Sequence, residues 1–208
     1  SRAFYNSNLG EYEKKITSLF RFDKVLPMNS GAEAVETAIK LARKWSYEIK
    51  GIKDGYAKII VCENNFHGRT TTIVSFSNDK DAHNNYGPFT PGFLRIPYND
   101  IEALAKVLED EAQHIAAFLV EPIQGEAGVY VPDEGYLKNA SELCKKHNVL
   151  FIADEVQTGI ARTGKLIACH HENVQPDILI LGKALSGGMY PVSAVLANNE
   201  IMKVIHPG

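Results

Sequence analysis

The chain has 208 residues, of which 45% are hydrophobic and 23% charged, and its formal net charge is −3. This composition is ordinary for a globular protein with one good core, and the small charge gives no reason to expect nucleic-acid or membrane binding. No apolar run approaches the ~20 residues that a membrane-spanning helix needs.

The three cysteines, Cys62, Cys144 and Cys169, are far apart and form no CxxC pair. An odd and sparse set argues for a reducing compartment and against a disulfide scaffold or a zinc site. The seven histidines show no metal-ligand spacing, so no metal is expected. The expected location is the cytoplasm.

Short apolar runs alternate with stretches of helical period along the chain. In order, the expected elements are helices at 9–20 and 32–48, strands at 58–62, 72–76 and 93–96, a helix at 100–111, a strand at 115–120, a helix at 134–146, strands at 149–153, 178–181 and 192–197, and a helix opening near residue 199. The longest loop is expected at 78–91. The alternation predicts βαβ units and hence the α/β class, a mostly parallel sheet flanked by helices.

The best-marked helix start is at Ser30. Ser30 and Glu33 have the spacing of a capping box, and apolar residues recur behind them on one face. Gly31 in the first turn leaves backbone N–H groups accessible at the positive end of the helix. This is a possible anion site, although most capping boxes mark only a helix start.

Asp154 and Lys183 each follow an apolar run that predicts a buried parallel strand. Ligands of open α/β sheets bind outside the carboxyl ends of the strands, so both side chains are expected to face one crevice. If the two strands are neighbours, their axes lie ~4.8 Å apart. A lysine amine and a carboxylate at one pocket suit pyridoxal phosphate, which needs a Schiff-base lysine and an acidic partner for its pyridine nitrogen.

These motifs also have other, more common interpretations. An aspartate after a strand is often a metal ligand, a cap or an ion-pair partner, and Gly-Lys is a common loop dipeptide. The run from Gly159 to Lys165 reproduces most of a phosphate-binding P-loop, but Leu166 stands where the magnesium-binding hydroxyl is needed. No GxGxxG, HExxH or GxSxG motif occurs in the sequence.

Several segments together resemble the class III (fold type I) pyridoxal-phosphate aminotransferases. They are Asn29-Ser-Gly-Ala-Glu-Ala34, Asn65-Phe-His-Gly-Arg-Thr70, Val120-Glu-Pro-Ile-Gln-Gly-Glu-Ala-Gly128, Asp154-Glu-Val-Gln-Thr-Gly159 and Leu181-Gly-Lys-Ala-Leu-Ser-Gly-Gly188. Their order and spacing are as in that family, and the resemblance covers essentially the whole chain. It implies the large domain of the fold type I transferases.

The resemblance implies a role in cofactor binding for five residues around the ring. Lys183 would form the Schiff base and then move the proton at the reacting carbon. Asp154 would pair with the pyridine nitrogen and keep it protonated. Gln157 would donate to the phenolic oxygen, Phe66 would stack on one ring face, and Val156 would pack on the other.

The resemblance also implies the phosphate and substrate contacts. Ser30, Gly31 and Ala32 would hold the phosphate through the helix start. Arg69 would form a bidentate clamp on a substrate carboxylate, with a solvated surface arginine as the alternative. Glu126 would pair with an arginine of the family that is not in these 208 residues.

Within the family, segments at residues 2–5, 87–92, 96–100 and 161–164 look most like the ornithine aminotransferases. The implied reaction moves the δ-amino group of ornithine to 2-oxoglutarate, giving glutamate 5-semialdehyde and glutamate. Acetylornithine and 4-aminobutyrate aminotransferases are the nearest alternatives, and a non-catalytic large-domain fragment is a third.

The family pattern also implies partners and missing parts. A homodimer with active sites at the subunit interface is expected, acting on small amino acids and 2-oxo acids. Residues 1–208 are expected to be an incomplete large domain, inactive alone, without the N-terminal segment and the C-terminal small domain. Members occur in the cytosol and in the mitochondrial matrix, so the matrix is the alternative location.

Overall fold

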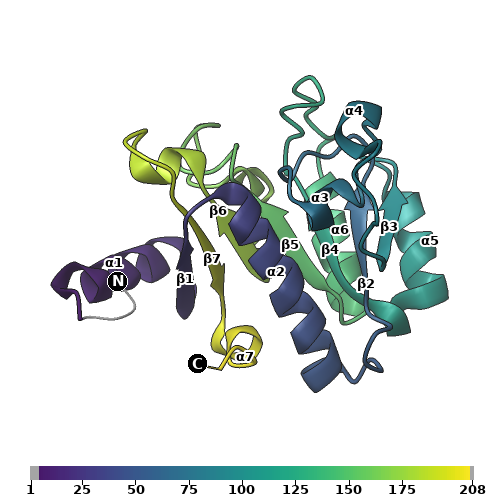
Figure 1. Cartoon of the computed structure of the whole chain (residues 1–208), viewed down its shortest axis with the longest axis horizontal. Helices are drawn as coiled ribbons and strands as arrows, with labels where there is room; N and C mark the ends of the chain where they lie inside the picture. Colours follow the sequence, from purple (N-terminus) through teal and green to yellow (C-terminus); the bar gives the residue numbers. More distant parts are fainter. Residues whose placement is uncertain (1–4, 207–208) are drawn as a thin grey trace.

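The computed structural model of the chain describes residues 5–206 (Figure 1). Residues 1–4 and 207–208 lie outside the described residues. Most of the segment at 2–5, which carried part of the resemblance, therefore lies outside them as well.

One twisted sheet organises the described part of the chain. Its strands are β1 (Lys24–Met28), β2 (Lys58–Cys62), β3 (Phe93–Ile96), β4 (Ile115–Val120), β5 (Leu150–Asp154), β6 (Ile178–Leu181) and β7 (Ser193–Ala197). Their order across the sheet is β1-β7-β6-β5-β4-β2-β3. The pairs from β3 to β6 are parallel, whereas β7 runs antiparallel to β6 and to β1. The predicted mostly parallel α/β sheet is confirmed.

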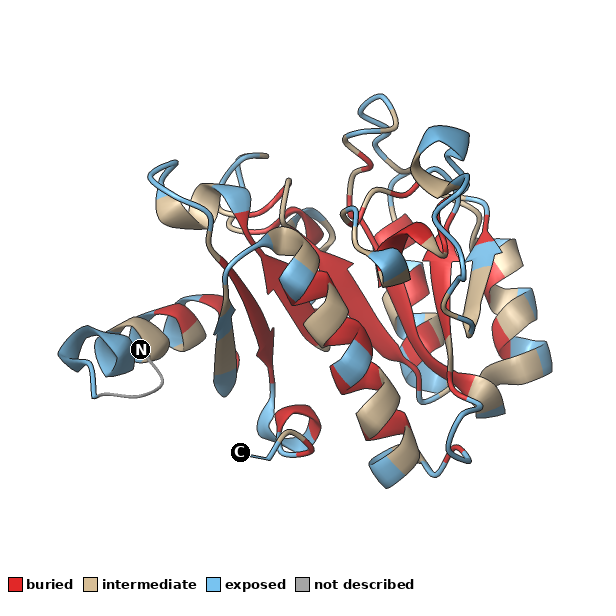
Figure 2. Ribbon diagram, in the orientation of Figure 1, coloured by how far each residue is buried: buried red, intermediate tan, exposed pale blue. Residues whose placement is uncertain are grey.

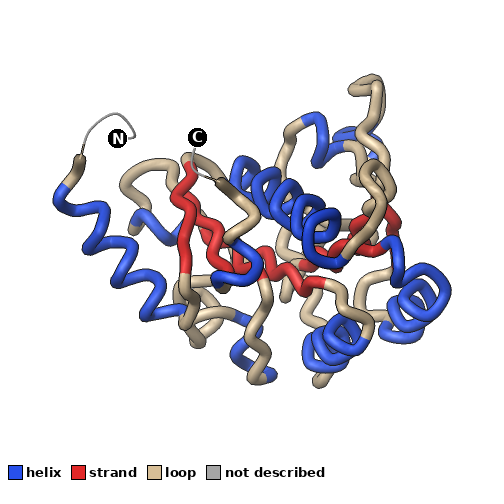
Figure 3. Tube along the Cα trace, turned by 90° about the horizontal axis from the view of Figure 1, so that it is seen from below, coloured by secondary structure: helices blue, strands red, loops and turns tan. Residues whose placement is uncertain are grey.

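Helices cover both faces of this sheet. They are α1 (Ser7–Phe20), α2 (Gly31–Trp45), α3 (Thr71–Val74), α4 (Lys80–His83), α5 (Ile101–Glu111), α6 (Tyr136–Lys146) and α7 (Asn199–Met202). Seen along the sheet, α2 lies on one side and α5 and α6 lie on the other (Figure 3). The core is accordingly split into two apolar layers, one against α2, α3 and α7 and one against α1, α5 and α6.

The central strands are buried on both faces (Figure 2). Successive strand residues point to opposite sides, so Phe151 and Ala153 join the α5 and α6 layer while Ile152 joins the α2 layer. Burial on both faces explains why these strands read as continuous apolar runs.

The expected strand at 72–76 is wrong. This segment contains α3, a single helical turn, and Ile73 and Phe76 pack into the α2 layer. A short β-branched run cannot be told from a buried helical turn by its pattern, and packing against α2 decides.

Strand β1 was not expected from the sequence. Pro27 lies within it, and proline cannot donate a hydrogen bond to a strand ladder, which disfavours a strand. The strand is tolerated because β1 is the edge of the sheet and has only β7 as its neighbour.

The other expected elements are present with boundaries shifted by a few residues. The helix expected at 32–48 begins at Gly31 and ends at Trp45, and a π-helical turn (Ser46–Lys50) follows it. The loop expected at 78–91 contains the single turn α4.

Two bulk properties follow from the described residues. Between residues 5 and 206, no helix combines the length and the apolar character needed to cross a membrane. All three cysteines are free and buried, and burial raises the pKa of the Cys62 thiol to about 12.

Candidate cofactor and active site

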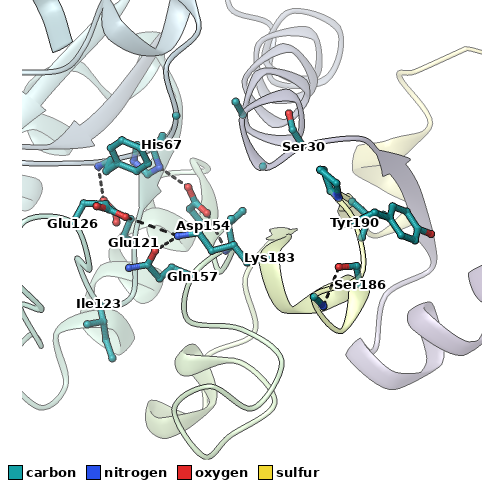
Figure 4. Close-up of a pocket in the computed structure, with 18 of the residues that line it drawn as sticks. Ser30, His67, Glu121, Ile123, Glu126, Asp154, Gln157, Lys183, Ser186 and Tyr190 are labelled. Carbon is teal, nitrogen blue, oxygen red and sulfur yellow. Dashed lines mark hydrogen bonds and ion pairs between the residues drawn. The ribbon is translucent and has the colours of Figure 1, made fainter.

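A cavity of about 600 Å3 lies at the carboxyl ends of β4, β5 and β6, beside the start of α2 (Figure 4). It brings together nine of the ten residues that the sequence singled out. They are Ser30, Gly31, Ala32, Phe66, Glu126, Asp154, Val156, Gln157 and Lys183. These residues are spread over most of the sequence, so the sheet topology, rather than proximity in the chain, assembles the cavity.

Asp154 is a buried carboxylate at the end of β5. It pairs in register with Ile180 of β6, which confirms that the two strands are neighbours. Its Oδ1 accepts the backbone N–H of Val156 at 3.1 Å, and its Oδ2 lies 2.7 Å from Nδ1 of His67. Only 5% of Asp154 is exposed, so its charge is balanced by protein groups rather than by bulk water.

Lys183 follows β6 by two residues and its amine points into the cavity. Its backbone φ is +38°, in a region that residues other than glycine rarely adopt. Nζ donates to the amide oxygen of Gln157 and lies 4.0 Å from a carboxylate oxygen of Glu126. Strained backbone persists where the surrounding structure enforces it, and such positions cluster at functional sites.

The start of α2 supplies the polar end of the cavity. Ser30 is the N-cap and accepts the N–H of Glu33 at 3.2 Å, while the Glu33 carboxylate accepts the N–H of Asn29 at 2.9 Å. Ser193 of β7 donates to the Ser30 carbonyl at 2.6 Å and ties the helix start to the sheet. The N–H groups of the first helical turn have no partner within the helix, so they are available to bind an anion.

Val156 packs against two glycines from different parts of the chain. A Cβ added at Gly31 would lie 2.9 Å from Val156 Cγ1, and one added at Gly182 would lie 3.1 Å from the same atom. A larger residue at either position would push Val156 into the cavity. The two glycines therefore set the position of one apolar wall.

Arg69 does not line this cavity. It lines an adjoining cavity of about 540 Å3, which shares Phe66 and Glu126 with the first and also contains Asp79 and Asp81. The guanidinium carbon of Arg69 lies 5.4 Å from the centre of the Phe66 ring. Arg69 is exposed and free to reach a ligand that extends past Phe66.

Two buried ionisable residues at the cavity were missed by the sequence reasoning. His67 contacts Asp154. Glu121 directly follows the last residue of β4, and Asp154 is the last residue of β5. Burial raises the pKa of Glu121 to about 7. The available signal was position: Glu121 directly follows a fully apolar strand next to the strand that carries Asp154.

Comparison with known proteins gives the family. The class-III aminotransferase family profile matches residues 1–208, and the chain belongs to this family. Class III aminotransferases depend on pyridoxal phosphate.

Individual relatives carry two different names. The chain is 62% identical over its whole length to a mitochondrial ornithine aminotransferase of Rattus norvegicus, covering 47% of that protein. The structure matches all of the chain to 49% of an ornithine aminotransferase of Toxoplasma gondii, with a TM-score of 0.97 and 53% identity. It also matches 48% of an acetylornithine aminotransferase of Elizabethkingia anophelis, with a TM-score of 0.87 and 75% identity. The chain spans about half the length of the curated relatives it matches.

Proposed function

We propose that this chain is the cofactor-binding part of an aminotransferase that takes the δ-amino group of ornithine and passes it to 2-oxoglutarate. The observation that supports this most is the cavity in which Lys183, Asp154 and the start of α2 meet. These three features come from the turn after β6, the end of β5 and the start of α2, and they supply an amine, an anion and a set of N–H donors around one space.

The residues fit pyridoxal phosphate by their chemistry. The phosphate suits the N–H groups of Gly31 and Ala32 because an anion is favoured at a helix N-terminus. The absence of a Cβ at Gly31 leaves Val156 in place as an apolar wall, and Phe66 supplies an aromatic one. Asp154 is the buried anion for the pyridine nitrogen.

When bound, the cofactor draws electrons from the substrate carbon that loses its proton. Lys183 would bind the cofactor covalently and then carry the proton to and from that carbon, which needs a flexible amine at the cavity. Gln157 is in contact with Nζ and would hold the amine near the ring. Asp154, anchored through both oxygens, would hold the proton on the pyridine nitrogen.

Ornithine is favoured over acetylornithine by the charges of the adjoining cavity. Arg69 there can bind a carboxylate, and Asp79, Asp81 and Glu126 can attract an ammonium group. The far end of ornithine carries both groups, whereas acetylation removes the ammonium charge. The acetylated donor is the second candidate, because a structure named for it shares 75% identity with this chain.

The test is a donor comparison with the full-length polypeptide and 2-oxoglutarate. Ornithine and N-acetylornithine differ only at the α-amino group, so they form a matched pair, with 4-aminobutyrate as the third donor. We expect the highest kcat/KM for ornithine. A higher value for either of the other donors would assign the chain to that branch of the family.

We also propose that the active unit is a homodimer with the site at its interface. Met189 and Tyr190 line the cavity yet are 82% and 67% exposed, and Val129 and Val131 are exposed as well. Exposed apolar side chains at a cavity favour a protein partner. Sedimentation of the full-length polypeptide should give a dimer, and a monomeric active enzyme would contradict this.

The compartment is part of the proposal. The free, buried cysteines suit a reducing compartment, either cytoplasm or mitochondrial matrix. The relative from Rattus norvegicus is named as mitochondrial. Fractionation of cells that express the full-length polypeptide separates the two.

A further inference from the structure

Beside Asp154, in the wall of the cavity, lies a cluster of buried ionisable groups. His67 is 4% exposed and its Nδ1 lies 2.7 Å from Oδ2 of Asp154. The other oxygen, Oδ1, accepts the N–H of Val156 at 3.1 Å. Both oxygens of Asp154 are therefore held by the protein, one by backbone and one by a titratable ring (Figure 4).

Glu121 is the third member of the cluster. It is 7% exposed and accepts the N–H of Phe66, the residue before His67, at 2.8 Å. Desolvation raises its pKa to about 7, the charge of His67 lowers it, and the charge of Asp154 raises it. Glu121 therefore gains its negative charge as the pH rises through the neutral range.

The surroundings of His67 favour its charged form. The charged groups that face it are Asp154 from β5 and Glu121 after β4, and the uncharged ring of Phe76 covers another side. Burial alone would lower the pKa of His67, but the hydrogen bond to Asp154 and the charges of both carboxylates raise it above its ordinary value. Among residues 5–206, Nε2 of His67 is buried without a hydrogen-bond partner.

Two buried carboxylates near one another repel, and each is costly without a compensating cation. We propose that His67 is a positioning residue for the reaction: as an imidazolium it keeps Asp154 charged and fixed toward the pyridine nitrogen, and Glu121 keeps His67 protonated. This inference rests on the proposed function. It assigns roles to two residues that act through Asp154.

A positioning role of His67 and a purely structural role predict different effects on ligand binding. If His67 acts through Asp154 on the ring nitrogen, its removal should weaken only ligands that have that nitrogen. Pyridoxamine 5′-phosphate and its 1-deaza analogue, which has C–H in place of the ring nitrogen, form a matched pair. Neither probe needs turnover or a covalent link to Lys183.

The experiment measures the dissociation constants of both probes with the full-length polypeptide. The His67→Asn variant keeps a neutral N–H near the position of Nδ1 and removes the charge. We expect about tenfold weaker binding of pyridoxamine 5′-phosphate, because a hydrogen bond to a charged group is stronger than a neutral one, and no more than about twofold weaker binding of the analogue. The Asp154→Asn variant should show the same selectivity, and adding His67→Asn to it should cost little more.

Glu121→Gln is the second variant, and it also serves if His67→Asn does not fold. Removing a nearby anion lets His67 lose its proton at lower pH. The variant should therefore bind pyridoxamine 5′-phosphate more weakly than the wild type at pH 8 and equally well at pH 6, with the analogue unaffected at both.

The contrary outcomes are distinct. Equal losses for the two probes would show that His67 only shapes the cavity, and unchanged binding of both would show that it has no role; either result overturns the inference. If the wild-type protein bound neither probe, the proposed function itself would fail and this inference with it.

Discussion

Substituting Gly31 by alanine should weaken cofactor binding through Val156. The new Cβ would lie 2.9 Å from Val156 Cγ1 and 3.3 Å from Cγ2. Ordinary carbon–carbon contacts start near ~3.5 Å, so Val156 has to give way. Valine is stiff at χ1, and Val156 lines the cavity, so we expect it to move toward the cavity.

The size of the effect follows from the overlap. Overpacking typically costs about 1–3 kcal/mol, and alanine in a helix regains up to about 1 kcal/mol over glycine. A net cost of roughly 1–2 kcal/mol, borne where the cofactor ring must fit, predicts about 5- to 30-fold weaker binding. Titration of the full-length polypeptide with pyridoxal phosphate, followed by absorbance, measures it.

The mechanism is tested by a second substitution. Val156→Ala alone should weaken binding modestly, because one apolar wall is lost, and Gly31→Ala should then add almost nothing to it. Gly10→Ala in α1 is the control, since a Cβ there meets nothing within 4 Å. If Gly31→Ala leaves affinity unchanged, or if its effect persists undiminished with Val156→Ala, the account of this wall is wrong.

Two further predictions concern the buried carboxylates. Asp154→Asn should lower turnover by at least ~10²-fold, the lower end for positioned acid–base groups, while cofactor affinity falls less; near wild-type kcat would refute its role. The raised pKa of Glu121 means that the folded state holds a proton that the unfolded state releases between about pH 4.5 and 7, so stability should fall as pH rises through that window. His67, with a raised pKa, adds to this loss in the same direction as pH rises past its ordinary range. Glu121→Gln should flatten the decline, measured as Tm against pH, and an unchanged profile would contradict the assignment.

The sequence indicated the site residues that lie at the ends of buried strands or at the start of a helix. Asp154 and Lys183 were found because each interrupts a run of apolar residues, and a strand buried on both faces leaves no other place for a charge. The start of α2 was found because Ser30 and Glu33 satisfy local hydrogen bonds, which depend only on neighbours in the chain.

The features that could not be predicted from the sequence depend on contacts between distant segments. His67 lies 87 residues from Asp154 in the chain, and nothing local to either residue indicates their contact. The turn at α3 and the edge strand β1 were decided by packing against α2 and by the free edge of the sheet. Arg69 was expected to bind a substrate carboxylate, and its side chain lies in the cavity that adjoins the cofactor site. The expectation that residues 1–208 alone are inactive stays a prediction.

The central claim is that Lys183 is the residue that binds the cofactor. The most direct measurement is borohydride reduction of the full-length polypeptide with pyridoxal phosphate, followed by peptide mapping of the fixed cofactor. The account predicts a single modified peptide with the cofactor on Lys183, and none when Lys183 is replaced by alanine. Modification of Lys165 or Lys203 in place of Lys183 would contradict it.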